Sequence, residues 1–463
     1  MFLVLCAGET GILLMVLSLY RAASKPDVSS FLSSIPGITF LCSSLIVVAS
    51  LFLTILTIKR SHPSSRKHQR MAIGMNLVAL FLTLSTAEGA IFALSKYTAM
   101  GETMMGVLLY PKHWSTIAAQ QKQALDKMVP ESSYYVHDPL LGWTLGPSRG
   151  NPTAKEITSS EGLRAPRVGM SFGDAKSRHS GASSRPASVR IALIGDSMTF
   201  GYEVRCEETW GHALEDLLQP HVQVLNFGVS GFGLNQTVLQ YEQVVRSWHP
   251  HIVIVGISSE MVRRINSIYT PLMNPEWGNA FARPRLVMTN GIPSAVNLPV
   301  LKPGELLGYA TIQEFPHRDL DAYYRPLQWE RGGIWYAFEH SYVFRFLNSI
   351  RPPAEAYPKD IEDEAIESSQ LATRYLVRKI LEDGAVPFVV RFPYAYELGI
   401  SNSPSAHMLH DADIEYYDSA ECLAKAGKSD AYMAGGHYSP KGNGHIAQCL
   451  KPIVRAQTNN LRH

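Results

Sequence analysis

Charged residues are scarce in this chain. They make up 18% of its 463 residues, whereas 46% are hydrophobic, and the formal net charge is only +2. No basic stripe with interleaved aromatic residues occurs after residue 97, which argues against nucleic acid as a partner. Only five cysteines occur, and no two of them form a C-x-x-C pair, so nothing indicates zinc or dithiol redox chemistry. The sequence contains no repeats and implies no metal or organic cofactor.

Three long apolar runs, 2–20, 38–58 and 71–94, lie at the start of the chain. A membrane-spanning helix needs ~20 apolar residues. Buried core helices are the alternative, but three successive runs with almost no charge disfavour it. The first run lacks the basic segment and the clear cleavage site of a signal peptide, so we expect it to be retained. The sequence therefore predicts three transmembrane helices, with 1–97 as a membrane anchor.

The charge of the loops predicts the orientation of this anchor. The loop between the second and third runs carries five basic residues and no acid: Lys59, Arg60, Arg66, Lys67 and Arg70. Such loops stay in the cytoplasm. We therefore expect a multi-pass protein of a bacterial inner membrane, with everything after about residue 97 outside the cytoplasm. Glu88 lies within the third run, and for it we favour a helix–helix or interfacial contact over a contact with a partner or lipid carrier.

Strands and helices alternate in the second half of the chain. Short apolar strands are expected at 189–194, 222–227, 251–257 and 386–392, and helices at 207–218, 234–248, 363–382 and 440–457. This alternation predicts an α/β domain with a doubly wound parallel sheet. We place it at 188–463, after a connector and lead-in at 98–187. An insertion at 266–358, rich in proline, arginine and aromatic residues, interrupts the alternation. A lid or substrate platform and a self-packed subdomain explain it equally well.

The strand at 189–194 ends abruptly at Gly195-Asp196-Ser197. A serine on a tight turn at the carboxyl end of a buried strand is well placed to act as a nucleophile. The segment G-D-S-x-T-x-G resembles block I of the SGNH (GDSL) hydrolase superfamily. The resemblance implies a flavodoxin-like sheet and makes Ser197 the nucleophile.

Two further segments follow in the order that this family has. Residues 226–231 match the N-x-G-x-x-G of block II, and the resemblance implies that the amides of Gly231 and Ser197 form an oxyanion hole. Asp196, Asn226 and Gly228 are assigned to the substrate-binding edge.

The third segment, 253–261, departs from the pattern of block III. Ser258, Ser259 and Glu260 stand where the family has asparagine. We take Ser259 as the candidate third oxyanion donor. Arg263 could contact an acidic substrate, although a solvated helix start explains it as well.

The last segment, Gly435 to Asn443, resembles block V, in which a histidine is the general base. His437 is the match. Ala434 occupies the usual position of the acid that orients this histidine, so Asp430, a backbone carbonyl or a Ser–His dyad remain as alternatives. Cys422 and Cys449 bracket this loop and form either a disulfide or two buried thiols.

Three functions are consistent with these segments. The first is a serine ester hydrolase that removes O-acyl groups, such as acetyl, from an envelope or extracellular polysaccharide. The second is an O-acyltransferase that receives acyl groups from a membrane partner, and the third is a non-catalytic glycan-binding module. We take the serine ester hydrolase as the predicted function and keep the other two as alternatives, with the departures in blocks III and V adding weight to the third.

Overall fold

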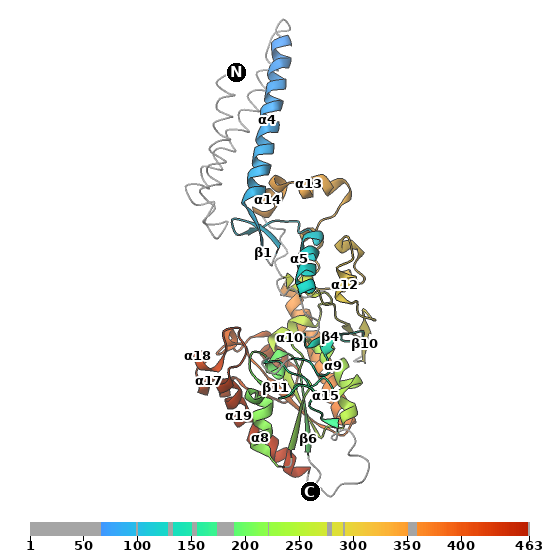
Figure 1. Ribbon diagram of the computed structural model, residues 1–463, viewed down its shortest axis with the longest axis vertical. Coiled ribbons are helices and arrows are strands. Elements are labelled where there is room, and N and C mark those ends of the chain that lie inside the picture. Colours follow the sequence, from blue (N-terminus) through green and yellow to red (C-terminus); the bar gives the residue numbers. More distant parts are fainter. Residues whose placement is uncertain are drawn as a thin grey trace.

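The computed structural model describes residues 66–98, 101–127, 133–150, 155–173, 189–220, 222–275, 280–289, 292–350 and 359–461. The described part is elongated (Figure 1). Helix α4 (Arg66–Leu94) lies at one end and the main sheet lies at the other. The segments between them come from both the connector and the insertion.

The main sheet has five parallel strands. They are β6 (Val189–Ile194), β7 (Val222–Asn226), β8 (Ile252–Ile257), β11 (Val386–Arg391) and β12 (Tyr416–Asp418). Their spatial order is β12-β11-β8-β6-β7. Counted along the chain this is 5-4-3-1-2, the flavodoxin-like order, so the predicted doubly wound sheet is confirmed. The sequence did not predict β12, because this three-residue edge strand has no apolar run.

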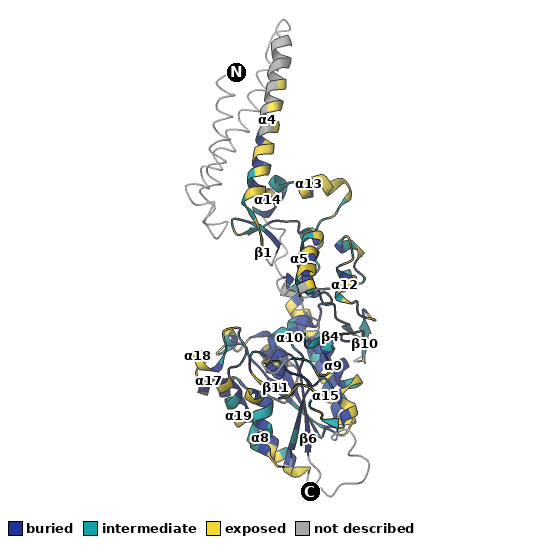
Figure 2. Cartoon of the chain, viewed as in Figure 1, coloured by how far each residue is buried: buried dark blue, intermediate teal, exposed yellow. Residues whose placement is uncertain are grey.

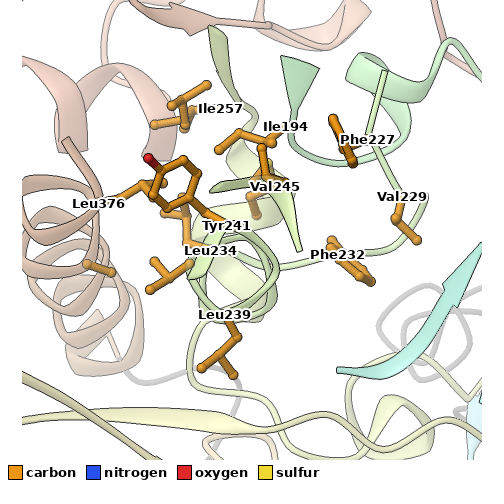
Figure 3. Close-up of a cluster of buried hydrophobic side chains, with 14 of the residues drawn as sticks. Ile194, Phe227, Val229, Phe232, Leu234, Leu239, Tyr241, Val245, Ile257 and Leu376 are labelled. Atoms are coloured by element: carbon orange, nitrogen blue, oxygen red, sulfur yellow. The ribbon is translucent and has the colours of Figure 1, made fainter. Parts of the chain in front are cut away.

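Helices cover both faces of the sheet. On one face lie α8 (Trp210–Leu218), α17 (Ala420–Ala426) and α19 (Pro440–Asn460); on the other lie α9 (Leu234–Gln243) and α15 (Lys359–Glu382). Strand β6 packs against the helices on both faces because its successive side chains point to opposite faces of the sheet. Leu193 belongs to the cluster on the side of α8 and α19. Ile194 belongs to the other cluster, with Leu234 of α9 and Leu376 of α15 (Figure 3). All six residues of β6 are buried, and all except Arg190 are apolar, as is typical of a strand covered on both faces.

The insertion forms its own hydrophobic core with the connector. Helix α5 (Trp114–Lys127) contributes Trp114, which is fully buried against insertion residues that include Tyr269, Phe315 and Trp329. Figure 2 shows buried residues along these segments, away from the main sheet. The insertion also carries the short helix α11 (Thr270–Met273) and the hairpin of β9 (Arg285–Thr289) and β10 (Ile292–Val296). It is therefore a subdomain packed with the connector.

The predicted anchor lies mostly outside the described residues, which include neither 2–20 nor 38–58. The third run corresponds to α4. Among the described residues, no helix has the length and apolarity needed to cross a membrane.

Glu88, near the end of α4, makes a contact within the chain. Its carboxylate accepts hydrogen bonds from the amides of Tyr342 and Val343 and from the hydroxyl of Ser341. These groups lie at the start of α14 (Tyr342–Ile350). Glu88 thus joins α4 to the insertion, in agreement with the expected helix–helix contact.

Cys422 and Cys449 form a disulfide that joins α17 to α19. Of the two alternatives left open by the sequence, the structure has the disulfide. Cys206 is a buried free thiol.

Candidate active site

Ser197 lies on the sharp turn after β6 and begins the short helix α7 (Ser197–Phe200). Asp196 caps this helix by accepting a hydrogen bond of 3.0 Å from the amide of Met198. The cap holds the serine at the carboxyl edge of the sheet, where it lines a large cavity. The structure thus places Ser197 where a nucleophile of an open α/β sheet is expected.

His437 lies directly beside Ser197, although 240 residues separate them in the chain. Its Nε2 is 2.9 Å from the Ser197 hydroxyl. The histidine belongs to the loop before α19, a helix that begins at Pro440 with Ser439 as its cap. The side chain of His437 is only 16% exposed, so the imidazole is mostly buried but solvent still reaches it. The structure therefore brings together the two residues that the sequence assigned to nucleophile and base.

Glu203 completes the set, although the sequence did not predict it. One carboxylate oxygen, Oε2, lies 2.8 Å from Nδ1 of His437 and also accepts a 3.2 Å hydrogen bond from the His437 amide. The other oxygen, Oε1, accepts a 3.1 Å hydrogen bond from the amide of Gly435. A carboxylate on Nδ1 fixes the tautomer that leaves Nε2 free to take a proton from serine.

The position of Glu203 also explains why the sequence did not reveal the acid that orients His437. It follows α7, on the nucleophile side of the site, and adopts a left-handed backbone with φ of 71°. Asp430, the acid nearest to His437 upstream, instead pairs with Lys441 at 2.7 Å on an exposed surface. The only sequence signal was Gly435, two residues before the histidine. A Cβ at Gly435 would lie 2.6 Å from the carboxylate carbon of Glu203.

The block II segment packs tightly against α7. The Asn226 side chain donates a 2.9 Å hydrogen bond to the Thr199 carbonyl and accepts one of 2.9 Å from the Gly228 amide. A Cβ at Gly228 would lie 2.5 Å from the amide nitrogen of Phe200, so a larger residue would push this loop off the helix. Gly231, with φ of 83°, then lines the cavity together with Ser197.

The residues in place of block III do not have the predicted arrangement. The Ser259 hydroxyl is buried, donates to Glu397 and lies 3.0 Å from the hydroxyl of Ser405. Ser259 is not among the residues that line the cavity, so its assignment as an oxyanion donor is wrong. Ser258 donates a 2.6 Å hydrogen bond to Asp196. The buried hydrogen bonds of both serines therefore hold neighbouring residues in place at the carboxyl edge of the sheet.

Tyr394 lies beside the nucleophile, on the side where block III was expected to supply a donor. Its ring lies 6.4 Å from that of His437, and its phenol lies close enough to Ser197 and Arg264 to interact with both. Burial raises the pKa of this phenol above its ordinary value of 10, so it stays protonated and can donate. Arg264 is itself buried and lies 3.5 Å from Asp196.

The cavity above Ser197 has a volume of about 1620 Å³. Eight aromatic side chains line it: Tyr134, Tyr135, Trp143, Tyr202, Phe281, Tyr394, Tyr396 and Tyr416. Of the residues assigned to substrate binding, only Arg263 lines the cavity, where it pairs with Glu260 at 2.8 Å. Asp196, Asn226 and Gly228 are not lining residues. Their buried hydrogen bonds shape the turns behind the site, which corrects their assignment.

Comparison with known proteins adds similarities of fold. No family model matches the chain, and a search of curated proteins found no match. Among solved structures, the chain is similar to a carbohydrate acetylesterase family member from Sinorhizobium meliloti, with 12% identity, a TM-score of 0.29, and coverage of 58% of this chain and 99% of that chain. It is also similar to an acetylxylan esterase from Geobacillus stearothermophilus, with 14% identity, a TM-score of 0.29, and coverage of 58% and 96%. A third is described as a lipolytic protein of the G-D-S-L family, from Desulfitobacterium hafniense, with 14% identity, a TM-score of 0.31, and coverage of 57% and 99%.

Proposed function

We propose that this protein is a serine esterase that uses Ser197, His437 and Glu203 as a catalytic triad. One observation carries the proposal: an unbroken series of contacts, 2.9 Å from serine to imidazole and 2.8 Å from imidazole to carboxylate, at the rim of a large cavity. A non-catalytic module would have no need for this alignment. The function that the departures in blocks III and V favoured is therefore the least supported of the three.

The arrangement accounts for each step of ester cleavage. The Ser197 hydroxyl attacks the acyl carbonyl while Nε2 of His437 takes its proton. Glu203 stabilises the imidazolium that forms, and the imidazolium then protonates the leaving alcohol. A water molecule, activated in the same way by His437, hydrolyses the acyl-serine and restores the enzyme.

The negative charge that develops on the carbonyl oxygen needs donors. The backbone amides of Ser197 and Gly231 are two of them. For the third we assign the Tyr394 hydroxyl, because it lies close to both Ser197 and Arg264. This phenol takes the place of the side-chain donor that the sequence lacks at block III.

The lining of the cavity supports an O-acylated carbohydrate as substrate. A volume of about 1620 Å³ exceeds what a single small ester requires. Aromatic rings such as Tyr134, Trp143 and Tyr396 offer flat apolar faces, and Asn402, His407 and Asp418 add hydrogen-bonding groups beside them. We assign a polysaccharide that carries small acyl groups, such as acetyl, located in the cell envelope or outside the cell and reached by a protein attached to the membrane through 1–97.

An O-acyltransferase remains the second candidate, because the same cavity could hold a sugar acceptor next to the acyl-serine. Hydrolysis and transfer share this intermediate and differ only in whether water or a sugar hydroxyl receives the acyl group.

The test uses the full-length chain, purified in mild detergent, with 4-nitrophenyl acetate and an acetylated xylan as substrates. We expect acetate release that is abolished in Ser197→Ala and unchanged in Ser171→Ala, an exposed serine outside the cavity. Acetyl-Ser197 in the mass spectrum that turns over only when an oligosaccharide is added would identify a transferase. If a fluorophosphonate fails to label Ser197 and no acetate is released, the enzymatic proposal is wrong.

A further inference from the structure

Two histidines and a glutamate gather at the junction between the connector and the insertion. They are His113, Glu330 and His340, and one ligand atom of each lies within 4.8 Å of the others. None of the three lines the active-site cavity. They come from three separate segments: His113 precedes α5, Glu330 lies in an irregular stretch, and His340 ends α13 (Tyr336–His340).

Backbone pairing places two of these segments side by side. Lys112 forms a parallel bridge with Trp329. The Lys112 amide donates a 2.7 Å hydrogen bond to Gln328, and the Glu330 amide donates one of 3.1 Å to the Lys112 carbonyl. His113 and Glu330, the residues that follow this bridge, are therefore held next to each other by the main chain.

The hydrogen bonds of the two imidazoles determine which nitrogen of each ring is available. Nε2 of His113 lies 2.9 Å from the Glu339 carbonyl, and Nδ1 of His340 lies 2.9 Å from the Tyr336 carbonyl. A carbonyl oxygen only accepts, so each of these nitrogens carries the hydrogen. Nδ1 of His113 and Nε2 of His340 then each have a free lone pair. Histidines that bind metals are oriented in this way, with the second ring nitrogen donating to a carbonyl or carboxylate.

The glutamate is oriented as well. One oxygen of Glu330 accepts a 3.1 Å hydrogen bond from the amide of Trp114, the first residue of α5. The other oxygen is available to a ligand. The rings of His113 and His340 stack with centroids 4.6 Å apart and planes 20° apart, so one ring must turn out of the stack before both free nitrogens can face one ion.

We propose that His113, Glu330 and His340 bind a zinc ion that joins the connector to the insertion. Two imidazoles and a carboxylate form a ligand set that suits Zn²⁺, and solvent can supply the fourth ligand because His340 is exposed. Bonds of ~2.0–2.2 Å place tetrahedral ligands roughly 3.3–3.6 Å apart. The ligand atoms lie within 4.8 Å of one another, so the cluster needs to contract by up to about 1.5 Å on binding. This site is independent of the proposed esterase, which requires no metal at Ser197.

The experiment measures zinc binding to the full-length chain, purified without a histidine tag and treated with EDTA. After dialysis against Zn²⁺, we expect about one zinc per chain by elemental mass spectrometry, and a rise in thermal unfolding temperature on adding Zn²⁺. His340→Ala and Glu330→Gln should each lose the bound zinc and the temperature shift. His317→Asn, an exposed histidine of the same insertion, should keep both.

Cobalt provides a readout that does not depend on stability. Co²⁺ at this site should give the visible absorption of a four-coordinate nitrogen–oxygen site, and His113→Ala should abolish it. Circular dichroism of each variant in EDTA shows whether the fold is kept. Equal zinc binding by wild type, His340→Ala and Glu330→Gln would overturn the proposal, as would the absence of stoichiometric zinc in the wild type.

Discussion

Glu203 and His437 are separated by 234 residues, yet a single carboxylate oxygen lies 2.8 Å from the imidazole and 3.2 Å from the amide of the same histidine. The other oxygen holds Gly435, two residues earlier. Glu203 therefore fixes both the ring and the backbone of the loop that carries the proposed base. Because it follows α7 directly, the nucleophile and the group that orients the base come from one short segment.

We expect Glu203→Gln to lower kcat for ester hydrolysis by about 10²–10⁴ while leaving the fold intact. The amide can donate to Nδ1, which favours the wrong tautomer, and it carries no charge to stabilise the imidazolium. Steady-state kinetics with 4-nitrophenyl acetate test this, with the exposed Glu207→Gln as the matched control. Activity within threefold of wild type would mean that Glu203 does not belong to the catalytic set.

Gly435→Ala tests the same contact from the other side. The new Cβ would lie 2.6 Å from the carboxylate carbon of Glu203, so the carboxylate must move away from His437. We expect kcat to fall at least tenfold with little change in the unfolding temperature, because the loop is largely exposed at this residue. Double-mutant analysis with Glu203→Gln provides the check: the two losses should not add, because both remove one interaction. Fully additive losses would contradict the shared contact.

The sheet and its helices could be predicted from the sequence, because each depends on local patterns. Ser197 and His437 were identified because their segments resemble those of a known family. Strand β6 shows its burial as an apolar run, and Gly195-Asp196-Ser197 marks the turn after it. Glu203 was not within reach, because its role depends on the path of a loop and on a residue 234 positions away.

The misassignment of Ser259 has a similar cause. Sequence spacing shows that this residue follows β8, but a difference of one position decides whether a side chain points to the cavity or to Glu397 beneath it. The insertion was likewise ambiguous, because the buried partner of its aromatic residues, Trp114, lies in the connector. Contacts between distant segments thus determine the parts that the sequence did not predict.

Tyr394→Phe should lower kcat by roughly 10²-fold and leave KM nearly unchanged. The phenol is assigned to the developing oxyanion, so its loss affects the transition state more than substrate binding. The ring itself remains, which keeps the packing near His437. A matched variant, Tyr396→Phe, removes a hydroxyl that contacts Arg263 and not Ser197, and it should retain kcat. A change confined to KM in Tyr394→Phe would assign this residue to binding instead.

Cys206 should be inert toward thiol reagents in the native protein. Burial raises the pKa of its thiol from 9 to about 12, so at pH 8 only about one molecule in 10⁴ carries the thiolate. The thiol therefore contributes stability below pH 9, and this contribution declines as the pH rises from 9 toward 12. Iodoacetamide treatment at pH 8 followed by peptide mapping should show no modification of Cys206 until urea unfolds the domain. Rapid modification of the folded protein would place this thiol at an open surface.

The disulfide between Cys422 and Cys449 should stabilise the sheet domain by about 2–4 kcal/mol, because it closes a loop across 27 residues. It ties α17 to α19, the helix that follows the His437 loop, so its loss should affect unfolding more than the geometry of the site itself. The double variant Cys422→Ala/Cys449→Ala should unfold at lower urea concentration than the wild type and keep most of its kcat. Adding a reductant separates the covalent link from packing: the wild type should then approach the stability of the variant, whereas the variant should not change. A wild type whose urea midpoint is insensitive to complete reduction would show that the cross-link contributes nothing to stability.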